Sequence, residues 1–348
     1  MFDMVRLWGD FPVITTVADD ITSENIDEVY PQYFPKQNTE LEAYQQIEKD
    51  LLDAVLYAPD NTPGNKTLFS KSVARTLLAK IYAEKPLRDY TKVIQYCDEV
   101  KADGFDLVDD FSDLFGMNAA GTDAKMRNTK ESILEAQFTS GAGNWCTWMF
   151  GRDLVNWNNN FTWAKWVTPS RDLISAFKQE GDEVRFKESI VYYDCNWSNY
   201  YPSDNYPFMY KCRSANSSII KYRYADVLLL KAEALIMQDT PDLEGAADII
   251  DEVRDRAKLG ALPTSVRSNK NVLLNALLKE RRLELAFEGQ RWFDLVRLDK
   301  VEEVMNAVYA KDSGRKAQIY TFDKNSYRLP IPQSVIDAND KIHQNPGY

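Results

Sequence analysis

The sequence predicts a mainly α fold of tetratricopeptide-like helix pairs (an α-α superhelix), with a large irregular aromatic-rich loop region and minor β structure. Two observations carry this prediction. Apolar residues recur at helical spacing in the two helical hairpin regions, 39–102 and 222–310. Between them, over 141–221, helical periodicity is mostly absent and aromatic residues are dense, which indicates a variable region of functional loops.

The first helical region begins with a helix predicted over residues 39–58. Thr39 and Glu42 form the capping box that marks its first turn, because each side chain satisfies a backbone N–H of the other residue. A cluster of turn-forming residues at 59–66 follows the helix. The apolar positions at helical spacing are Leu41, Tyr44, Ile47, Leu51, Leu52, Val55 and Leu56.

Two further helices are predicted over 70–84 and 87–102, the first capped by Ser70 and the second opened by Pro86. A set of small and apolar positions within them recurs with the same offsets in the second helical region. Small residues early in a helical hairpin and apolar residues later resemble the tetratricopeptide pattern, which predicts stacked helix pairs. The two series are Ala79, Tyr82, Val93, Cys97 and Val100, and Ala232, Leu235, Ala246, Ile250 and Val253.

The aromatic-rich region contains most of the tryptophans and several tyrosines, interleaved with asparagine, and one short helix is expected in it over 170–179. Rigid rings with a polar edge stack on the faces of sugar rings, while amides bind hydroxyls, so this composition predicts a carbohydrate-binding surface. The alternative for each ring is burial in the core of the loop layer. The candidate ligand-binding residues are Trp157, Trp163, Asn158, Asn160, Trp145, Trp148, Tyr200 and Tyr201.

Composition excludes several classes of protein. The net charge of −11 argues against a nucleic-acid partner, which favours a basic face. The longest aliphatic run, from Val227 to Leu230, is far shorter than a membrane span. One histidine, His343, and four cysteines without a CxxC pair predict no metal site, no cofactor and no histidine-based catalytic group.

The cysteines carry a structural prediction instead. Cys97 lies on an apolar helical stripe and is expected to be a buried thiol. Cys195 and Cys212 are able to pair in an exported protein, but several pairings that include Cys146 are equally compatible with the sequence.

The segment from Leu278 to Leu298, LKERRLELAFEGQRWFDLVRL, predicts a helical hairpin. Its first helix ends at Gly289, and its second runs to about Ala310. The apolar stripes predict a packed core that contains buried arginine–glutamate pairs, with no role at a working site.

This segment resembles the helix-turn-helix near the C-terminus of SusD/RagB-family proteins, which are outer-membrane glycan-binding lipoproteins. Other segments resemble the family in the same order from end to end, and together they are specific. They are residues 2–15, a helix end and turn; 130–135, a strand; 221–234, a helix; and 329–333 with 344–348, the tail.

The resemblance implies a cell-surface protein that delivers oligosaccharide to a SusC-like TonB-dependent transporter, without enzymatic activity. It also implies a single domain over 1–348 that is N-terminally truncated. Family members begin with a lipoprotein signal, a lipidated cysteine and a first set of helices. This chain opens in what resembles a later helix, without a signal or an anchor.

Two other functions stay open. A helical-repeat scaffold that binds a protein partner is consistent with the repeated offsets. A glycoside hydrolase is the third possibility, since the aromatic-rich region contains several carboxylates; their spacing marks no catalytic pair.

Overall fold

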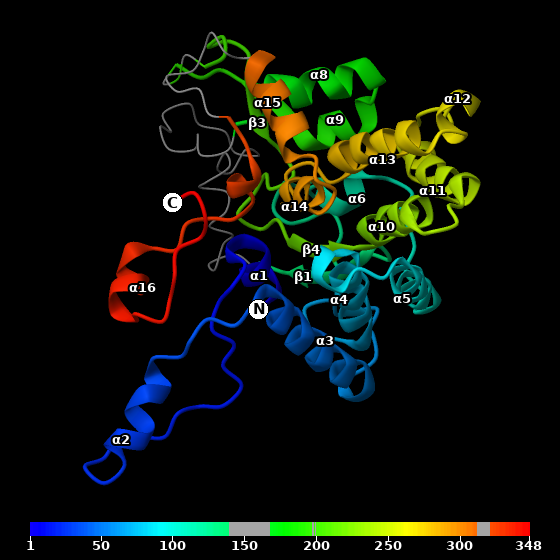
Figure 1. Cartoon of the computed structure of the whole chain (residues 1–348). Helices are drawn as coiled ribbons and strands as arrows, with labels where there is room; N and C mark the ends of the chain where they lie inside the picture. Colours follow the sequence, from blue (N-terminus) through cyan, green and yellow to red (C-terminus); the bar gives the residue numbers. More distant parts are fainter. Residues whose placement is uncertain (139–167, 197, 199, 312–320) are drawn as a thin grey trace. The chain divides into compact units, whose positions relative to one another are not determined.

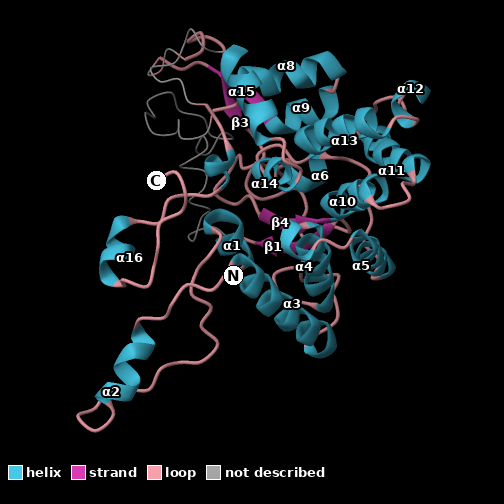
Figure 2. Ribbon diagram, viewed as in Figure 1, coloured by secondary structure: helices cyan, strands magenta, loops and turns pink. Residues whose placement is uncertain are grey.

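The computed structural model describes residues 1–138, 168–196, 198, 200–311 and 321–348 (Figure 1). Helices dominate and the strands are short, which confirms the predicted mainly α fold (Figure 2). The chain divides into two compact units. Unit 1 comprises Met1–Asp53, Ile81–Asp89 and Trp292–Tyr348, and unit 2 comprises Ala54–Lys80 and Tyr90–Arg291.

In unit 1, helix α1 packs against helix α3. Phe2 of α1 packs edge to face against Tyr44 of α3, with ring centroids 6.3 Å apart. The predicted capping box is present at the start of α3: the Thr39 N–H donates to Glu42 Oε2 (2.8 Å), and the Glu42 N–H donates to Thr39 Oγ1 (3.2 Å). The helices are α1 (Phe2–Trp8), α2 (Ile26–Val29), α3 (Glu40–Tyr57, whose residues from Ala54 onward belong to unit 2), α14 (Arg291–Arg297, whose first residue belongs to unit 2), α15 (Val301–Lys311) and α16 (Gln333–Ala338), with 3-10 turns η1 (Tyr30–Tyr33), η2 (Lys85–Leu87) and η4 (Lys324–Tyr327).

The two ends of the chain meet within unit 1. The Leu329 N–H donates to the carbonyl of Leu7 (2.7 Å) at the end of α1. The Asn345 side-chain amide donates to the carbonyls of both Trp8 (3.0 Å) and Leu329 (2.7 Å). The N-terminal and tail segments that resemble the family are therefore joined by backbone and amide hydrogen bonds.

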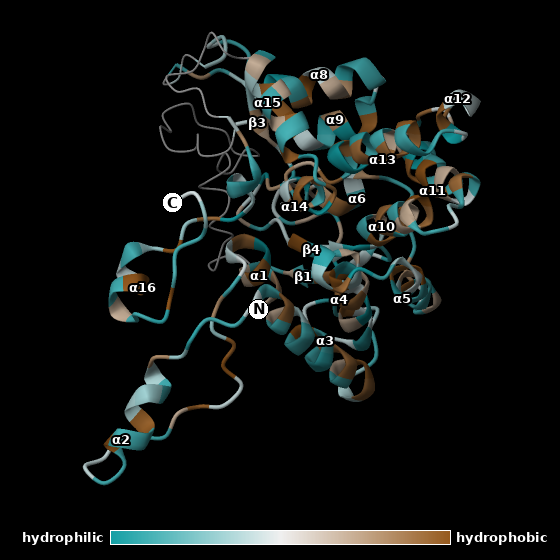
Figure 3. Ribbon diagram, in the orientation of Figure 1, coloured by the Kyte–Doolittle hydropathy of each residue, from teal (hydrophilic) through white to brown (hydrophobic). Residues whose placement is uncertain are grey.

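Unit 2 is built around α10, whose side chains are nearly all buried because α5, α11 and α13 pack against it. Hydrophobic and hydrophilic residues both occur along α13, as expected of a helix with one apolar face (Figure 3). The helices are α4 (Lys71–Ala83, whose last residues belong to unit 1), α5 (Tyr90–Ala102), α6 (Ser112–Phe115), α8 (Arg171–Glu180), α9 (Glu183–Ser189), α10 (Tyr224–Met237), α11 (Leu243–Arg256), α12 (Thr264–Arg267) and α13 (Lys270–Glu284).

The repeated offsets mark core positions. All ten residues of the two series are buried, which confirms the predicted helical packing. Arg75 of α4 reaches toward the C-terminal end of α5, with Nε 3.0 Å from Glu99 and Nη1 2.8 Å from Asp103. Cys97 is a buried thiol, as predicted, and burial raises its pKa above the ordinary value.

The described strands form two antiparallel pairs. Strand β1 (Ser132–Ala136) pairs with β4 (Ile219–Arg223), and this confirms the strand predicted at 130–135. Strand β2 (Ile190–Tyr193) pairs with β3 (Tyr206–Met209). Residues 221–223, predicted as the start of a helix, belong instead to β4, and α10 begins after them.

The C-terminal helical hairpin differs from its prediction in two places. Helix α13 ends at Glu284, before the predicted end at Gly289, because Phe287 (φ 66°) and Gly289 (φ 73°) both have left-handed backbone conformations. The second helix is broken into α14 and α15 rather than continuous. Asp299 has a φ of 54°, and the Lys300 N–H returns to the carbonyl of Leu295 (2.8 Å), which ends α14.

One other predicted boundary also changes. Pro86 lies in the 3-10 turn η2 instead of opening α5, because the backbone of Arg88 is not helical (ψ 116°). The second part of the aromatic-rich region is regular, with α8, α9, β2 and β3. The helix predicted over 170–179 is present as α8, and the Ser170 hydroxyl accepts the N–H of Leu173 (3.1 Å) as its N-cap.

Candidate functional site

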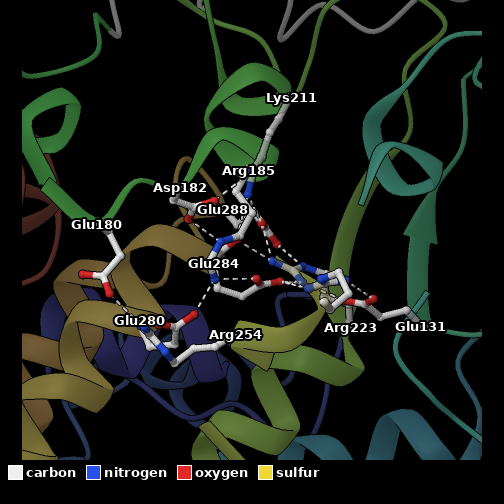
Figure 4. A network of polar contacts seen from close by, with 11 residues as sticks. Glu131, Glu180, Asp182, Arg185, Lys211, Arg223, Arg254, Glu280, Glu284 and Glu288 are labelled. Carbon is white, nitrogen blue, oxygen red and sulfur yellow. Dashed lines mark hydrogen bonds and ion pairs between the residues drawn. The ribbon is translucent and has the colours of Figure 1, made fainter. Parts of the chain in front are cut away.

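A network of buried charges occupies the centre of unit 2 (Figure 4). The carboxylate of Glu284 on α13 accepts hydrogen bonds from Arg223 (2.5 Å), Arg185 (3.0 Å) and Arg256. Glu131, which precedes β1, accepts from Arg223 (2.7 Å) and Arg256 (3.0 Å). The network therefore joins α9, α11 and α13 to the strand pair β1–β4.

The network extends to both sides of Glu284. Glu280, one turn earlier on α13, accepts from Arg185 (2.5 Å) and from Arg254 (3.3 Å). Glu288 is 2.7 Å from Nε of Arg223 and 2.6 Å from Nζ of Lys211. Carboxylates on α13 and in the turn that follows it thus meet cations from several other elements.

The two signs of charge shift the pKa values in this network differently. Burial by itself would raise the pKa of Glu284, but the guanidinium groups of Arg256, Arg223 and Arg185 outweigh burial and hold that pKa well below its usual range. Burial lowers the pKa of Lys211 to about 8, and the neighbouring Glu288 offsets only part of this effect. Glu284 is therefore an anion in the folded protein at neutral pH.

The network has a structural role. The predicted burial of arginines and glutamates in the Leu278–Leu298 segment is confirmed, but the partners come mostly from other elements. Arg281, for example, pairs with Asp226 of α10 (2.8 Å). Because these charges are enclosed and paired with one another, they hold helices together and present no surface to a ligand. Two of their nitrogens, Nη2 of Arg185 and Nε of Arg256, are buried without a hydrogen-bond partner among the described residues.

A surface hollow of about 440 Å³ lies beside α8 in unit 2. One side is formed by α8, which Ser170 caps at its N-terminus and Gly181, in a left-handed conformation, ends at its C-terminus. Strand β2 and the loop before β3 complete the lining. The lining residues are Arg171, Ile174, Ser175, Lys178, Gln179, Tyr192, Tyr201, Pro202 and Asn205.

Two adjacent tyrosines and an arginine form an ordered group at this hollow. The rings of Tyr200 and Tyr201 meet edge to face, with centroids 5.1 Å apart. The guanidinium carbon of Arg171 lies 4.0 Å from the Tyr200 ring centroid and 4.5 Å from that of Tyr201. The Tyr201 hydroxyl donates to the carbonyl of Pro169 (2.7 Å), and Arg171 donates to the carbonyl of Tyr200, so the group is held in place.

The structure locates two of the predicted ligand-binding residues. Tyr201 lines the hollow, and Tyr200 is an exposed neighbour that does not line it. The other predicted residues, Trp145, Trp148, Trp157, Asn158, Asn160 and Trp163, lie outside the described residues.

The sequence did not single out Arg171, Lys178 or Asn205 for this hollow. The available signal was the short helix itself, because residues 171, 174, 175 and 178 share one face at helical spacing. No sequence signal could place Asn205 or Tyr192 beside that face, since tertiary packing brings β2 and the following loop to α8.

Another hollow, in unit 1, has a different character. Its volume is about 540 Å³, and most of its lining is apolar, including Phe11, Phe34, Ile331 and Val335. Three of its four non-aromatic polar side chains already make hydrogen bonds: Asp10 accepts the N–H of Glu40 (2.7 Å), Gln37 donates to the carbonyl of His343 (3.1 Å), and Asn339 donates to the carbonyl of Pro35 (2.8 Å). The hollow beside α8 is therefore the better candidate for a sugar ligand.

The described residues contain neither a cluster of metal ligands nor a helix able to span a membrane. No group of histidine, cysteine, aspartate and glutamate side chains in the described ranges is arranged to hold a metal ion. Within the same ranges, no helix combines the length and the apolar character that a membrane span requires.

Comparison with known proteins agrees with this fold. The model of the SusD family matches residues 204–348. SusD-like protein P2 of Formosa agariphila is 28% identical over 396 residues, which cover 100% of this chain and 71% of that protein.

Solved structures of SusD-like proteins cover the whole of this chain, and two of them illustrate the likeness. A laminarin-binding SusD-like protein superposes with a TM-score of 0.71 at 25% identity, and the match covers 76% of that structure. A SusD superfamily protein from Bacteroides vulgatus gives a TM-score of 0.74 at 18% identity over 75% of its chain. Residues 204–348 thus match the SusD/RagB family, and the relative aligned along the whole chain and the shared fold extend this similarity to the rest of the chain.

Proposed function

We propose that this chain binds oligosaccharides at the cell surface and delivers them to a SusC-like TonB-dependent transporter of the outer membrane. The observation that carries the proposal is the hollow beside α8, which is lined by the aromatic residues Tyr192 and Tyr201 and by polar residues such as Ser175 and Asn205. Rings stack on sugar faces, and amides and hydroxyls bind sugar hydroxyls. The similarity to a laminarin-binding protein supports the same ligand class.

We further propose that the aromatic-rich region extends this binding surface. Trp157 and Trp163, with Asn158 and Asn160 between them, would stack on and bind additional sugar residues, as would Trp145 and Trp148. The proposal includes a single SusD-like domain over 1–348 and attachment to the outer membrane through a lipid anchor. The family resemblance supports these points.

Binding without catalysis is also part of the proposal. A hydrolase of this kind needs two carboxylates across the scissile bond, roughly 5–9.5 Å apart. The described acidic residues of α8 are engaged elsewhere, since Asp172 is 2.7 Å from Arg282, and Glu180 is 2.7 Å from Arg254. We therefore expect no release of reducing sugar from any bound glycan.

A glycan array followed by isothermal titration on the full chain tests the ligand class. We expect at least one oligosaccharide to bind, and we expect Tyr201→Ala to weaken that binding, because the ring lines the hollow. Tyr57→Ala is a suitable control, since Tyr57 is an exposed tyrosine at the end of α3 and does not line the hollow. Absence of binding to every glycan would overturn the proposal.

A protein partner has separate support in unit 2. Leu56, Tyr57, Leu68 and Phe69 expose large apolar side chains at the end of α3 and before α4, with Leu56 67% and Tyr57 83% exposed. The Lys71 N–H donates to the carbonyl of Pro59 (2.9 Å), which ties these two segments together. Exposed apolar groups of this kind are typical of protein contacts.

Co-purification with a co-expressed SusC-like transporter tests this second proposal. We expect Leu56→Glu or Phe69→Glu to reduce the recovery of the transporter while glycan binding is retained. Full recovery with both variants would exclude these side chains from the contact.

A further inference from the structure

The hollow beside α8 has a local charge opposite to that of the whole chain. Arg171 and Lys178 line it from positions two helical turns apart on α8, which lie on one helix face. None of the described residues that line the hollow is acidic, although the chain carries a net charge of −11. Neutral sugars are commonly bound through carboxylates and amides, so a cationic lining indicates a different ligand chemistry.

The acidic residues of α8 are held outside this lining. Asp172 pairs with Arg282, and Glu180 pairs with Arg254, so both carboxylates form ion pairs with residues of α11 and α13. Asp204 is exposed in the loop beside the hollow but is not among the residues that line it. The fold thus separates the two signs of charge along one short helix.

The position of Arg171 suits an anion. Its guanidinium stacks against the rings of Tyr200 and Tyr201. The same guanidinium donates a hydrogen bond to the backbone carbonyl of Tyr200, which fixes its orientation. A guanidinium has five N–H donors in a planar fork that matches the oxygens of a carboxylate or an oxyanion. Lys178 supplies a second, point-like positive charge.

We propose that this hollow binds the acidic group of an anionic saccharide, a ring carboxylate or a sulfate ester, between Arg171 and Lys178. This inference rests on the proposed glycan-binding function. The rings of Tyr192 and Tyr201 would contact the sugar face, and Ser175, Gln179 and Asn205 would bind its hydroxyls.

Isothermal titration of the full chain with matched saccharides tests this inference. One pair is a β-1,4-linked oligoglucose and the oligoglucuronate of the same length, and the other is a galactan oligosaccharide and its sulfated form. We expect the acidic member of one pair to bind roughly tenfold tighter than the neutral member, which corresponds to one charge-assisted contact. Its affinity should also fall as added salt screens the charges. The two pairs distinguish a carboxylate from a sulfate.

Charge-neutralising variants locate the contact. Lys178→Gln should lower affinity for the acidic saccharide by roughly tenfold and leave affinity for the neutral one nearly unchanged. Arg171→Gln should do the same, with an additional loss of stacking on the tyrosines. Lys187→Gln is the matched control, because Lys187 is an exposed lysine of the neighbouring α9 and does not line the hollow.

The possible outcomes separate the two proposals. Equal affinity for acidic and neutral saccharides would overturn the anionic ligand and leave glycan binding intact. Binding of acidic saccharides with no difference between Lys178→Gln and Lys187→Gln would overturn the placement in this hollow. Failure of every saccharide to bind would overturn the proposed function and this inference together.

Discussion

Glu284 of α13 and Arg223 at the end of β4 form an ion pair of 2.5 Å in which both residues are almost completely enclosed, with 0% and 1% of the side chain exposed. Burying a charge is costly unless it is paired and hydrogen bonded. Arg256 and Arg185 complete the pairing of Glu284, and Glu131 and Glu288 complete that of Arg223. The fold of unit 2 therefore depends on each member of this network being present.

The first prediction concerns the loss of one such charge. Glu284→Gln keeps the shape of the side chain but removes the negative charge that pairs with Arg185, Arg223 and Arg256. It should therefore lower the free energy of unfolding by about 3–5 kcal/mol. Urea unfolding measures this change. The control is Glu244→Gln, which breaks a 2.5 Å pair with Arg267 at a side chain that is 74% exposed. That variant should stay within about 0.5 kcal/mol of the parent, and equal effects would contradict the prediction.

The second prediction concerns the loss of folding stability at low pH that results from Asp226. Burial alone would raise the pKa of Asp226, but the charges of Lys80 (2.6 Å) and Arg281 (2.8 Å) outweigh it and hold that pKa far below the usual value. Because the folded pKa lies below the unfolded value of about 3.9, stability from this group is present above that pH and lost as the pH falls below it.

Asp226→Asn should therefore be less stable at neutral pH and should lose less stability between neutral pH and about pH 3 than the parent. Melting temperatures measured across this range check the result. Asp60→Asn is the control, since its side chain is 87% exposed and pairs with Lys71 at 3.0 Å. The prediction is wrong if Asp226→Asn and the parent lose stability in parallel.

The third prediction concerns the tryptophans proposed to bind glycan. Trp157→Ala and Trp163→Ala should weaken glycan binding while changing stability by no more than about 0.5 kcal/mol, as expected of exposed rings. Titration calorimetry and thermal melts on the single variants provide both readouts. Trp292→Ala serves as a reference, because Trp292 packs against the cluster of Leu295 and Val301.

A buried tryptophan would behave in the opposite way, since truncation leaves a cavity and costs roughly 3–5 kcal/mol. A large fall in melting temperature for both Trp157→Ala and Trp163→Ala would place those rings in the core. The stacking surface would then have to involve Trp145, Trp148 or the tyrosines near Tyr200.

The fourth prediction concerns the end of α8. Gly181 has a φ of 69° and ends the helix, and no atom lies within 4 Å of the position that a Cβ would occupy. Gly181→Ala should therefore cost about 1 kcal/mol through backbone strain alone. Gly260→Ala is the control, because that position is equally open and has no left-handed φ. Unfolding free energies that do not differ between the two variants would show that strain is not the cause.

Helix positions followed from local sequence wherever periodicity and caps acted together. The capping box of Thr39 and Glu42 set the start of α3, and Ser170 set the start of α8. The predicted helix boundaries were wrong where the cap and turn signals in the sequence were weak. Phe287 and Asp299 adopt left-handed conformations that nothing in their side chains requires, so the breaks around α14 were not predicted.

The candidate site was predicted only in part. The aromatic composition predicted a carbohydrate-binding region, and Tyr201, one of its candidate residues, lines the hollow. The pairing of Arg171 with the two tyrosine rings was not predicted, because it depends on how the loop after β2 returns to α8. A cation and an aromatic ring that contact each other in the fold have no characteristic separation along the sequence, so no sequence pattern predicts the contact.

The sequence by itself determined the helical periodicity, the helix caps and the family resemblance, because these depend on residues a few positions apart along the chain. Only the tertiary structure decided which charges meet. Glu131, Arg223 and Glu284 are separated by scores of residues in the sequence, yet they share one network at distances of 2.5–2.7 Å. Buried ion pairs of this kind form where packing excludes water from both partners, and that exclusion exists only once the helices and strands have assembled.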